Sequence, residues 1–255
     1  FAGTVAFNDT LTKDVVGGYW YTAASISDTA YGLSVFEADS VYCIFDRVQL
    51  VISLVDDRID VGDLAMISRT GTYEYDDSAF TGIVTYNDTL SQDVVGGYWY
   101  TAASISDSTY GLTEFESNSV YCIFDSVTIT LTVNDGRIDV DSDASITASG
   151  VYDYDNEMYD GTITLNDTTI KSSVGKYDYT TQSISDDSHG ITVFESNTVS
   201  VVFDKVHINL NIDDSRIDVG ADANITWTGY YEYDSAAFAG TVAFNDTLTK
   251  DVVGG

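Results

Sequence analysis

The chain of 255 residues carries 41 acidic and only 10 basic side chains, which gives a net charge of −31. This charge excludes nucleic acid as a partner, because a phosphate backbone is bound by Lys and Arg, and it disfavours an anionic membrane surface. A hydrophobic content of 44% excludes a disordered acidic tail, and no apolar run approaches the roughly 18 residues of a membrane helix.

The sequence repeats with a step of 79 residues. The tripeptide Asn-Asp-Thr begins at Asn8, Asn87, Asn166 and Asn245. Residues 1–18 recur without change as residues 238–255. A fixed period of this length indicates one small domain copied in tandem. The duplicated ends lead us to expect a segment cut from a longer array.

The predicted elements are short β-strands, taken here in chain order. The first covers residues 3–7 and ends at the Asn-Asp-Thr turn. Others cover residues 19–27 and 40–45. Residues 48–55 alternate between apolar and outward positions, as do the equivalent residues 127–133 and 206–212, and such alternation indicates a strand with one buried face. His207 falls on the outward register and is predicted to be a solvated surface residue.

A turn-rich corner, Asp-x-Arg-Ile-Asp, follows at residues 56–60, and another strand is predicted within residues 65–75. No stretch shows a helical period. About seven short strands per repeat, at intervals of roughly 8 to 12 residues, predict an all-β fold of tandem immunoglobulin-like β-sandwiches. A set of small all-β barrels is the alternative.

This strand pattern places the boundaries of the repeats. Whole repeats are predicted at residues 46–124 and 125–203, and a split repeat has its first part at 204–255 and its last part at 1–45. Each part would expose a sheet edge and an apolar face. We expect further chain, or a neighbouring molecule acting by strand addition, to complete it. The overlap favours further chain, because two identical segments cannot fill one place.

Cys43 and Cys122 stand at the same position of consecutive repeats, where the third repeat has Val201. Equivalent points of such domains lie about 30–40 Å apart, whereas a disulfide needs Cα atoms within about 7 Å. We therefore expect no bridge between them and predict a small buried apolar position in each repeat.

Five segments of the repeat carry a resemblance: Ile-Phe-Asp-Arg-Val, Asp-x-Arg-Ile-Asp-Val-Gly, Tyr-Glu-Tyr-Asp, Gly-Thr-Val…Asn-Asp-Thr and Ser-Ile-Ser-Asp…Tyr-Gly-Leu. Together they resemble the tandem immunoglobulin-like repeats of large archaeal cell-surface proteins of the surface-layer, filament or adhesin type. The resemblance covers all three repeats. It implies an exported, structural and glycosylated surface protein, and it offers no catalytic motif.

The acceptor motifs for N-linked glycan are the clearest chemical signal. They begin at Asn8, Asn87, Asn166, Asn245 and, as Asn-Ile-Thr within a predicted strand, Asn224. The motif marks a glycan acceptor in an exported protein and an exposed loop. Asn-Asp is also a favourable turn. The Thr is kept in every copy although a turn does not require it, and this favours glycosylation.

The acidic corners are weak candidates for calcium, a hard cation that prefers several oxygen ligands. The carboxylates concerned are Asp56, Asp60, Asp135, Asp139, Asp214 and Asp218. An Arg lies between the two members of each pair and can neutralise them by salt bridging. No other metal or cofactor is expected.

The three Trp residues stand where other repeats carry charged side chains, so we predict them on the surface. Exposed aromatic side chains suit contact with a neighbouring molecule or with sugar, and plain surface scatter is the alternative. Trp227 conflicts with this expectation, because its parity matches that of Ile225. A bulge near Gly229 would remove the conflict.

The sequence contains no nucleophile–base pair, phosphate loop or His-rich set, so we expect no enzyme. It predicts a self-associating structural repeat protein of an extracellular, glycosylated filament or surface layer. The alternative is the stalk of a cell-surface adhesin that binds glycan or protein, stiffened by calcium.

Overall fold

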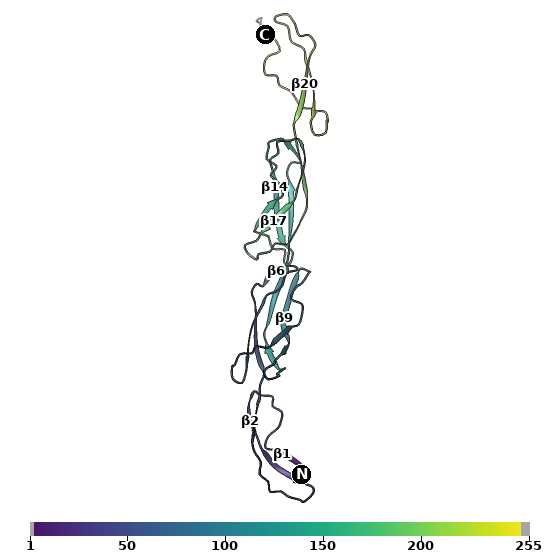
Figure 1. Ribbon diagram of the computed structural model, residues 1–255. Helices are drawn as coiled ribbons and strands as arrows, with labels where there is room; N and C mark the ends of the chain where they lie inside the picture. The colour runs from purple at the N-terminus through teal and green to yellow at the C-terminus, as the bar shows by residue number, and fades with distance from the viewer. Residues whose placement is uncertain (1–2, 251–255) are drawn as a thin grey trace. The chain divides into compact units, whose positions relative to one another are not determined.

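The computed structural model describes residues 3–250, which form strands, turns and loops (Figure 1). The predicted all-β fold is confirmed. The part of the chain that the structure describes contains no helix that could span a membrane. The chain divides into two compact units, Phe1–Asp125 and Ser126–Gly255, and each is described by itself.

The described residues of the first unit, from residue 3 on, contain eleven strands. They are β1 (Gly3–Phe7), β2 (Gly17–Tyr21), β3 (Ala23–Asp28), β4 (Val41–Phe45), β5 (Val48–Leu54), β6 (Arg58–Asp60), β7 (Ile67–Tyr73), β8 (Ile83–Tyr86), β9 (Gly96–Ser106), β10 (Phe115–Ser117) and β11 (Ser119–Asp125). Strands β10-β5-β7 form one sheet and β6-β11-β9-β8 a second, while β1-β3 and β2-β4 are two-stranded.

The second unit, as far as the structure describes it (to residue 250), contains ten strands. They are β12 (Val127–Val133), β13 (Arg137–Asp139), β14 (Ile146–Tyr152), β15 (Thr162–Leu165), β16 (Gly175–Tyr179), β17 (Thr181–Ser185), β18 (Phe194–Ser196), β19 (Val199–Asp204), β20 (Val206–Ile212) and β21 (Ile225–Tyr231). The sheets are β14-β12-β18, β13-β19-β16, β15-β17 and β20-β21.

The predicted alternation in residues 48–55 is confirmed in β5, where Val48, Leu50 and Ile52 are buried. Val48 and Leu50 meet Val84 of β8 and Ile105 of β9, which belong to the other sheet, in one apolar cluster. Two sheets that bury facing side chains are consistent with a β-sandwich. A second cluster lies around Tyr100, Cys122 and Phe124, and the second unit contains the same pair of clusters. The boundaries of the repeats stay predictions.

The sequence does not predict two short strands, β6 and β10, and both form parallel pairs. β10 pairs with β5, and β6 pairs with β11. Each has only three residues, which is too short to show a period of two. The β6 residues are predicted as part of a turn because Asp residues surround them. The second unit repeats both pairings, β18 with β12 and β13 with β19.

The predicted strand at 19–27 is divided in the structure into β2 and β3. Its equivalent in the next repeat, β9, is continuous but pairs with β8 through a register shift between Thr85 and Tyr86. The same shift separates Ala6 from Phe7 in β1. The irregularity lies beside the Asn-Asp-Thr turn, where the Asn side chain bonds to the backbone of residue 22 or 101.

Strand β20 differs from its equivalents β5 and β12. It pairs only with β21 among the described strands, and Val206, Leu210 and Ile212 are exposed. A bulge near Gly229, which would remove the conflict, is absent, since the β20–β21 register is regular throughout. Trp227 therefore lies on the same face of β21 as Ile225, as the alternation of side chains along a strand requires. Its side chain is half-buried against Phe238, and the two ring centroids are 6.0 Å apart. The surface prediction was wrong for this Trp.

Candidate functional sites

The Asn-Asp-Thr motif forms a specific structured turn. Asn87 Nδ2 donates to Trp99 O at 3.0 Å, and Thr101 N donates to Asn87 Oδ1 at 2.8 Å. Asn8 makes the same two bonds, at 3.2 and 2.9 Å, and so does Asn166, at 3.3 and 3.0 Å. The Asn side chain therefore replaces ladder hydrogen bonds at the bulge between two strands.

The other two residues of the motif also have structural partners. Asp88 Oδ1 accepts from Thr89 N at 2.7 Å, and the Thr89 hydroxyl donates to Ser91 O at 3.3 Å. The same local bonds recur at Thr10, Thr168 and Thr247. The turn thus does use the Thr, contrary to the expectation that it does not. The fold therefore provides a reason for the retention of Thr that does not involve glycosylation.

A buried tyrosine holds this turn from inside. Tyr100, with no exposed surface, donates its hydroxyl to Thr89 O at 3.0 Å. Tyr21 and Tyr179 do the same at 3.0 and 3.1 Å to the equivalent Thr carbonyls. The four acceptors of the repeated motif, Asn8, Asn87, Asn166 and Asn245, are all exposed. Because Nδ2 carries two hydrogens, an acceptor Asn can keep its backbone bond and still present one N–H to solvent.

Asn224 lies just before β21 rather than within a strand, where the sequence predicts it. It is exposed, and its Nδ2 donates to the Asp213 carboxylate. Asp213 N in turn donates to Asn224 O at 3.3 Å. This Asn therefore belongs to a hairpin end, which is a different setting from the four repeated turns.

The acidic corners do not gather into a metal centre in residues 3–250, where no three His, Cys, Asp or Glu side chains form a suitable group. Arg58 of the first corner reaches Asp125, with Nη2–Oδ2 at 2.5 Å and Nε–Oδ2 at 2.9 Å. Both side chains are buried. The guanidinium therefore supplies the positive charge that a carboxylate needs in the interior.

The corners at residues 135–139 and 214–218 have different contacts from the corner of Arg58. Arg137 lies 3.6 Å from Asp204 and 2.5 Å from Asp234. Asp135 and Asp214 accept the backbone N–H of the Arg two residues later, at 3.5 and 3.0 Å. These carboxylates cap a turn, which is a common use of Asp in loops.

Exposed aromatic pairs recur on two of the sheets. Trp20 packs on Tyr42 at 5.0 Å and Trp99 on Tyr121 at 4.9 Å, and both indoles are more than half exposed. The surface prediction is correct for these two Trp residues. In the third repeat, Asp178 stands at this position and accepts from Ser200. The aromatic surface is therefore not a feature of every repeat.

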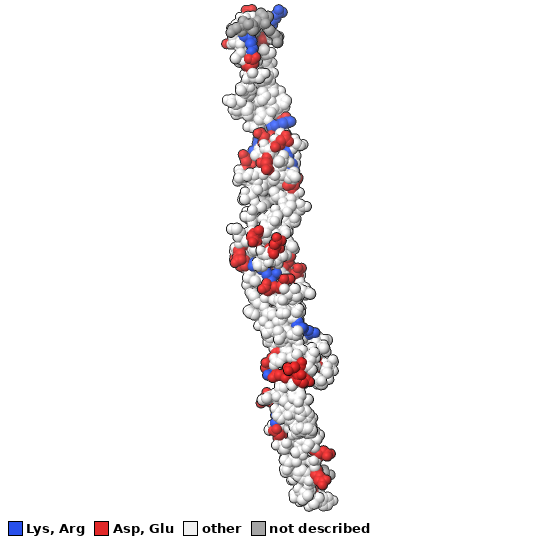
Figure 2. All heavy atoms as spheres, turned by 90° about the vertical axis from the view of Figure 1, so that its left-hand side faces the viewer, with Lys and Arg blue, Asp and Glu red and all other residues white. Residues whose placement is uncertain are grey.

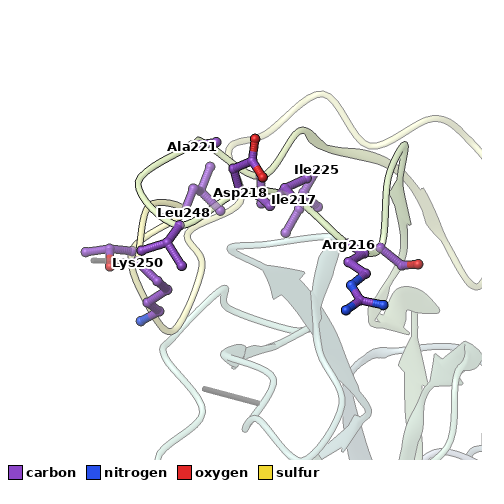
Figure 3. Close-up of a pocket in the computed structure, with 11 residues that line it drawn as sticks. Arg216, Ile217, Asp218, Ala221, Ile225, Leu248 and Lys250 are labelled. Carbon is purple, nitrogen blue, oxygen red and sulfur yellow. The ribbon is translucent and has the colours of Figure 1, made fainter. Parts of the chain in front are cut away.

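A hollow of about 490 Å³ lies under the third corner. Figure 3 shows Ile217, Ile225 and Leu248 around it. Between residues 46 and 125, the equivalent residues Ile59, Ile67 and Leu90 pack against Tyr100, Cys122 and Phe124. The sequence predicts an exposed apolar face on β20, but it gives no sign of the hollow, because the hollow joins residues from separate loops.

The two cysteines differ in burial although they share a repeat position. Both are free, as expected. Cys122 and its equivalent Val201 have no exposed surface, so the core prediction is correct there. Cys43 is exposed, so the prediction was wrong for it. The physical reason is that Ala65, Leu54 and Ile67 pack in one apolar cluster with Cys122 of β11, whereas β4 pairs only with β2 among the described strands. His207 is exposed, as predicted, and stacks on Tyr230 at 5.0 Å.

Most of the charged side chains are acidic. Figure 2 shows Asp and Glu in several groups on one face, with few Lys and Arg among them.

No family model matches the chain, and no curated protein sequence matches it.

Proposed function

We propose that this chain is a structural repeat module of an extracellular filament or surface layer and that it is not an enzyme. The observation that carries the proposal is the recurrence of one built arrangement at a step of 79 residues. The bonds of Asn8, Asn87 and Asn166 recur with the same partners. Such strict repetition is typical of arrays in which each unit has the same mechanical task.

The finer fold assignment is part of the proposal. Two small sheets with facing apolar clusters, seven strands between residues 46 and 125, and Tyr-anchored turns support an immunoglobulin-like sandwich. The resemblance to archaeal cell-surface repeats supports the same assignment and favours a location outside the cell.

Imaging of the purified chain by electron microscopy tests the structural function. We expect regular fibres or sheets with an axial repeat. Isolated flexible threads that bind glycan or protein ligands would instead support an adhesin stalk, for which exposed Trp20 and Trp99 are the favourable observation. If the chain showed no ordered assembly and also bound no ligand, both functions would be contradicted.

We further propose that Asn8, Asn87, Asn166, Asn245 and Asn224 carry N-linked glycan. Their exposure supports this, and glycan on an acidic surface would keep an extracellular array soluble. Mass spectrometry of glycopeptides from native material is the test. Thr89→Ser, which keeps the acceptor motif, should leave Asn87 modified, whereas Thr89→Val should abolish modification there alone. Unmodified Asn at all five positions would refute the proposal.

A further inference from the structure

We propose that Trp99 and Tyr121 form an aromatic platform on which the glycan carried by Asn87 packs. The ligand is a saccharide that is bound covalently to the same repeat. The inference rests on the proposed glycosylation of Asn87, and it states where the attached sugar lies and which side chains hold it.

The two rings of the aromatic platform are held in place by the sheet. Trp99 of β9 and Tyr121 of β11 stand directly opposite each other in an antiparallel ladder. Their ring centroids are 4.9 Å apart, at an interplanar angle of 43°, and Trp99 is 61% exposed. The next pair on this face is Thr101 and Ser119. Aromatic rings bordered by hydroxyl groups suit a sugar, which presents apolar C–H groups on its face and hydroxyl groups at its edge.

A glycine makes room for the platform. A Cβ at Gly97 would overlap the hydroxyl oxygen of Tyr121, so any side chain at this position would push the Tyr121 ring away from Trp99. Gly18 has the same relation to Tyr42. The strand therefore gives up a side chain at this position and accommodates an exposed ring instead.

Comparison of the repeats shows that these three positions change together. The residues 79 positions earlier are of the same types, namely Gly18, Trp20 and Tyr42, and the two rings are again close, at 5.0 Å. The residues 79 positions later are all different, namely Lys176, Asp178 and Ser200. There the Ser200 hydroxyl donates to Asp178 at 2.6 Å, and Lys176 lies 3.5 Å from the same carboxylate. Replacement of the Gly, Trp and Tyr as a set indicates that they serve one purpose.

The acceptor asparagine lies beside the platform. Asn87 Nδ2 donates to the main-chain oxygen of Trp99 at 3.0 Å, and Thr101 N donates to Asn87 Oδ1 at 2.8 Å. The amide is therefore held against the part of β9 that carries the indole. Neighbouring strands are about 4.8 Å apart, so a sugar on Nδ2 needs to extend over about one strand spacing to cover Trp99.

The covalent link favours the repeat's own glycan over a saccharide from elsewhere. Contact between one sugar ring and one indole is weak for a free saccharide. Attachment to Asn87 makes the contact intramolecular, and a short tether raises the effective concentration of the sugar to the millimolar range or above. The same reasoning applies to Asn8, whose Nδ2 donates to Trp20 O at 3.2 Å.

Oxidative footprinting of the full chain tests the proposal. Chain from a host that attaches N-linked glycan and chain from a host that does not are exposed briefly to hydroxyl radicals. Mass spectrometry then quantifies oxidation at each residue and glycan occupancy at Asn87. We expect Trp99 to be oxidised about fivefold more slowly where Asn87 carries glycan, which corresponds to a contact of about 1 kcal/mol. Tyr110, which is 66% exposed in the loop beyond β9, is the internal control.

NMR spectroscopy of the glycan separates stacking from mere proximity, because a ring current shifts the signals of sugar protons that lie over an indole upfield. We expect such signals from the glycan of Asn87 and none from that of Asn166. A matched variant copies the third set into β9 and β11, which is compatible with folding because Asp178 and Ser200 pair in the same register. It combines Gly97→Lys, Trp99→Asp and Tyr121→Ser, and it should abolish the upfield signals without changing occupancy.

The reciprocal variant should create a platform beside Asn166. It combines Lys176→Gly, Asp178→Trp and Ser200→Tyr, and it should give the glycan of Asn166 upfield signals of its own.

The outcomes separate this inference from the proposed glycosylation. Occupied Asn87 with sugar signals that the first variant does not change would overturn the platform and leave glycosylation standing. Unmodified Asn87 in chain from the glycosylating host would overturn both. Protection of Trp99 in chain without glycan, on association of copies, would assign the platform to a protein contact and overturn the inference.

Discussion

At the scale of single residues, buried polar side chains hold the loops by bonding to backbone groups. Asp186 is an example in the second unit. Its carboxylate accepts from Ser188 N at 2.9 Å, His189 N at 3.2 Å and Ile191 N at 3.1 Å. Burial raises the pKa of Asp186, but the backbone donors outweigh burial and hold the pKa below its ordinary value. One carboxylate thus shapes the whole loop that follows β17.

The depressed pKa of Asp186 predicts how stability depends on pH. A carboxyl whose pKa is lower in the folded state stabilises the fold above its unfolded pKa of about 3.9, and this contribution is lost as the pH falls through the folded pKa. Urea unfolding should therefore show a loss of stability below about pH 4. Asp186→Asn should remove about 1–3 kcal/mol at pH 7 and flatten that acid dependence. The exposed neighbour provides the control, since Asp187→Asn should leave the stability at pH 7 unchanged.

At the scale of strands, an amide side chain joins the two sheets of each complete repeat. Asn118 Oδ1 accepts from Ile52 N at 2.7 Å, while its Nδ2 donates to Ile52 O at 2.8 Å. Asn197 makes the same two bonds to Leu131, at 2.6 and 2.9 Å. Each Asn thereby completes the edge of β5 or β12 beyond the three-residue parallel strand.

Replacing this amide by a carboxylate should weaken the repeat. In Asn118→Asp, one oxygen still accepts from Ile52 N, but the other faces Ile52 O and cannot donate to it. We expect a loss of about 1–3 kcal/mol in the free energy of unfolding, measured by urea denaturation at pH 7. Lowering the pH to protonate the introduced carboxylate should restore part of the loss. An unchanged midpoint would show that the Nδ2 bond contributes nothing.

The acidic corners should not require a divalent cation for stability. Arg58 already compensates buried Asp125, and the described residues gather no metal-binding group. Adding calcium, or removing it with a chelator, should shift the Tm by less than about 1 °C. Magnesium at the same concentration controls for ionic strength. A rise of several degrees specific to calcium would reinstate the corners as binding sites and favour the calcium-stiffened stalk.

At the scale of the whole molecule, a net charge of −31 opposes association between copies. Raising the salt concentration from about 10 to 150 mM shortens the Debye length from about 30 to 8 Å. We therefore expect self-association to strengthen with salt over this range, as measured by analytical ultracentrifugation. Weaker association at higher salt would indicate that ion pairs between copies outweigh the overall repulsion.

The sequence by itself determined the strands that are long enough to show a period. In residues 48–55 the alternation could be read directly because one face is buried and the other is solvated. The repeat step, the free cysteines and the exposed acceptor asparagines also followed from the sequence, since each depends on residue type and spacing.

Only the tertiary structure decided what depends on partners distant in the sequence. β6 and β10 are too short to have a pattern and exist because β11 and β5 offer parallel edges. Asn118 contacts Ile52 across 66 residues. Cys43 and Cys122 have one local sequence context but opposite burial, because burial is set by the apolar side chains that pack against a residue from elsewhere in the chain, as Ala65 and Ile67 do at Cys122.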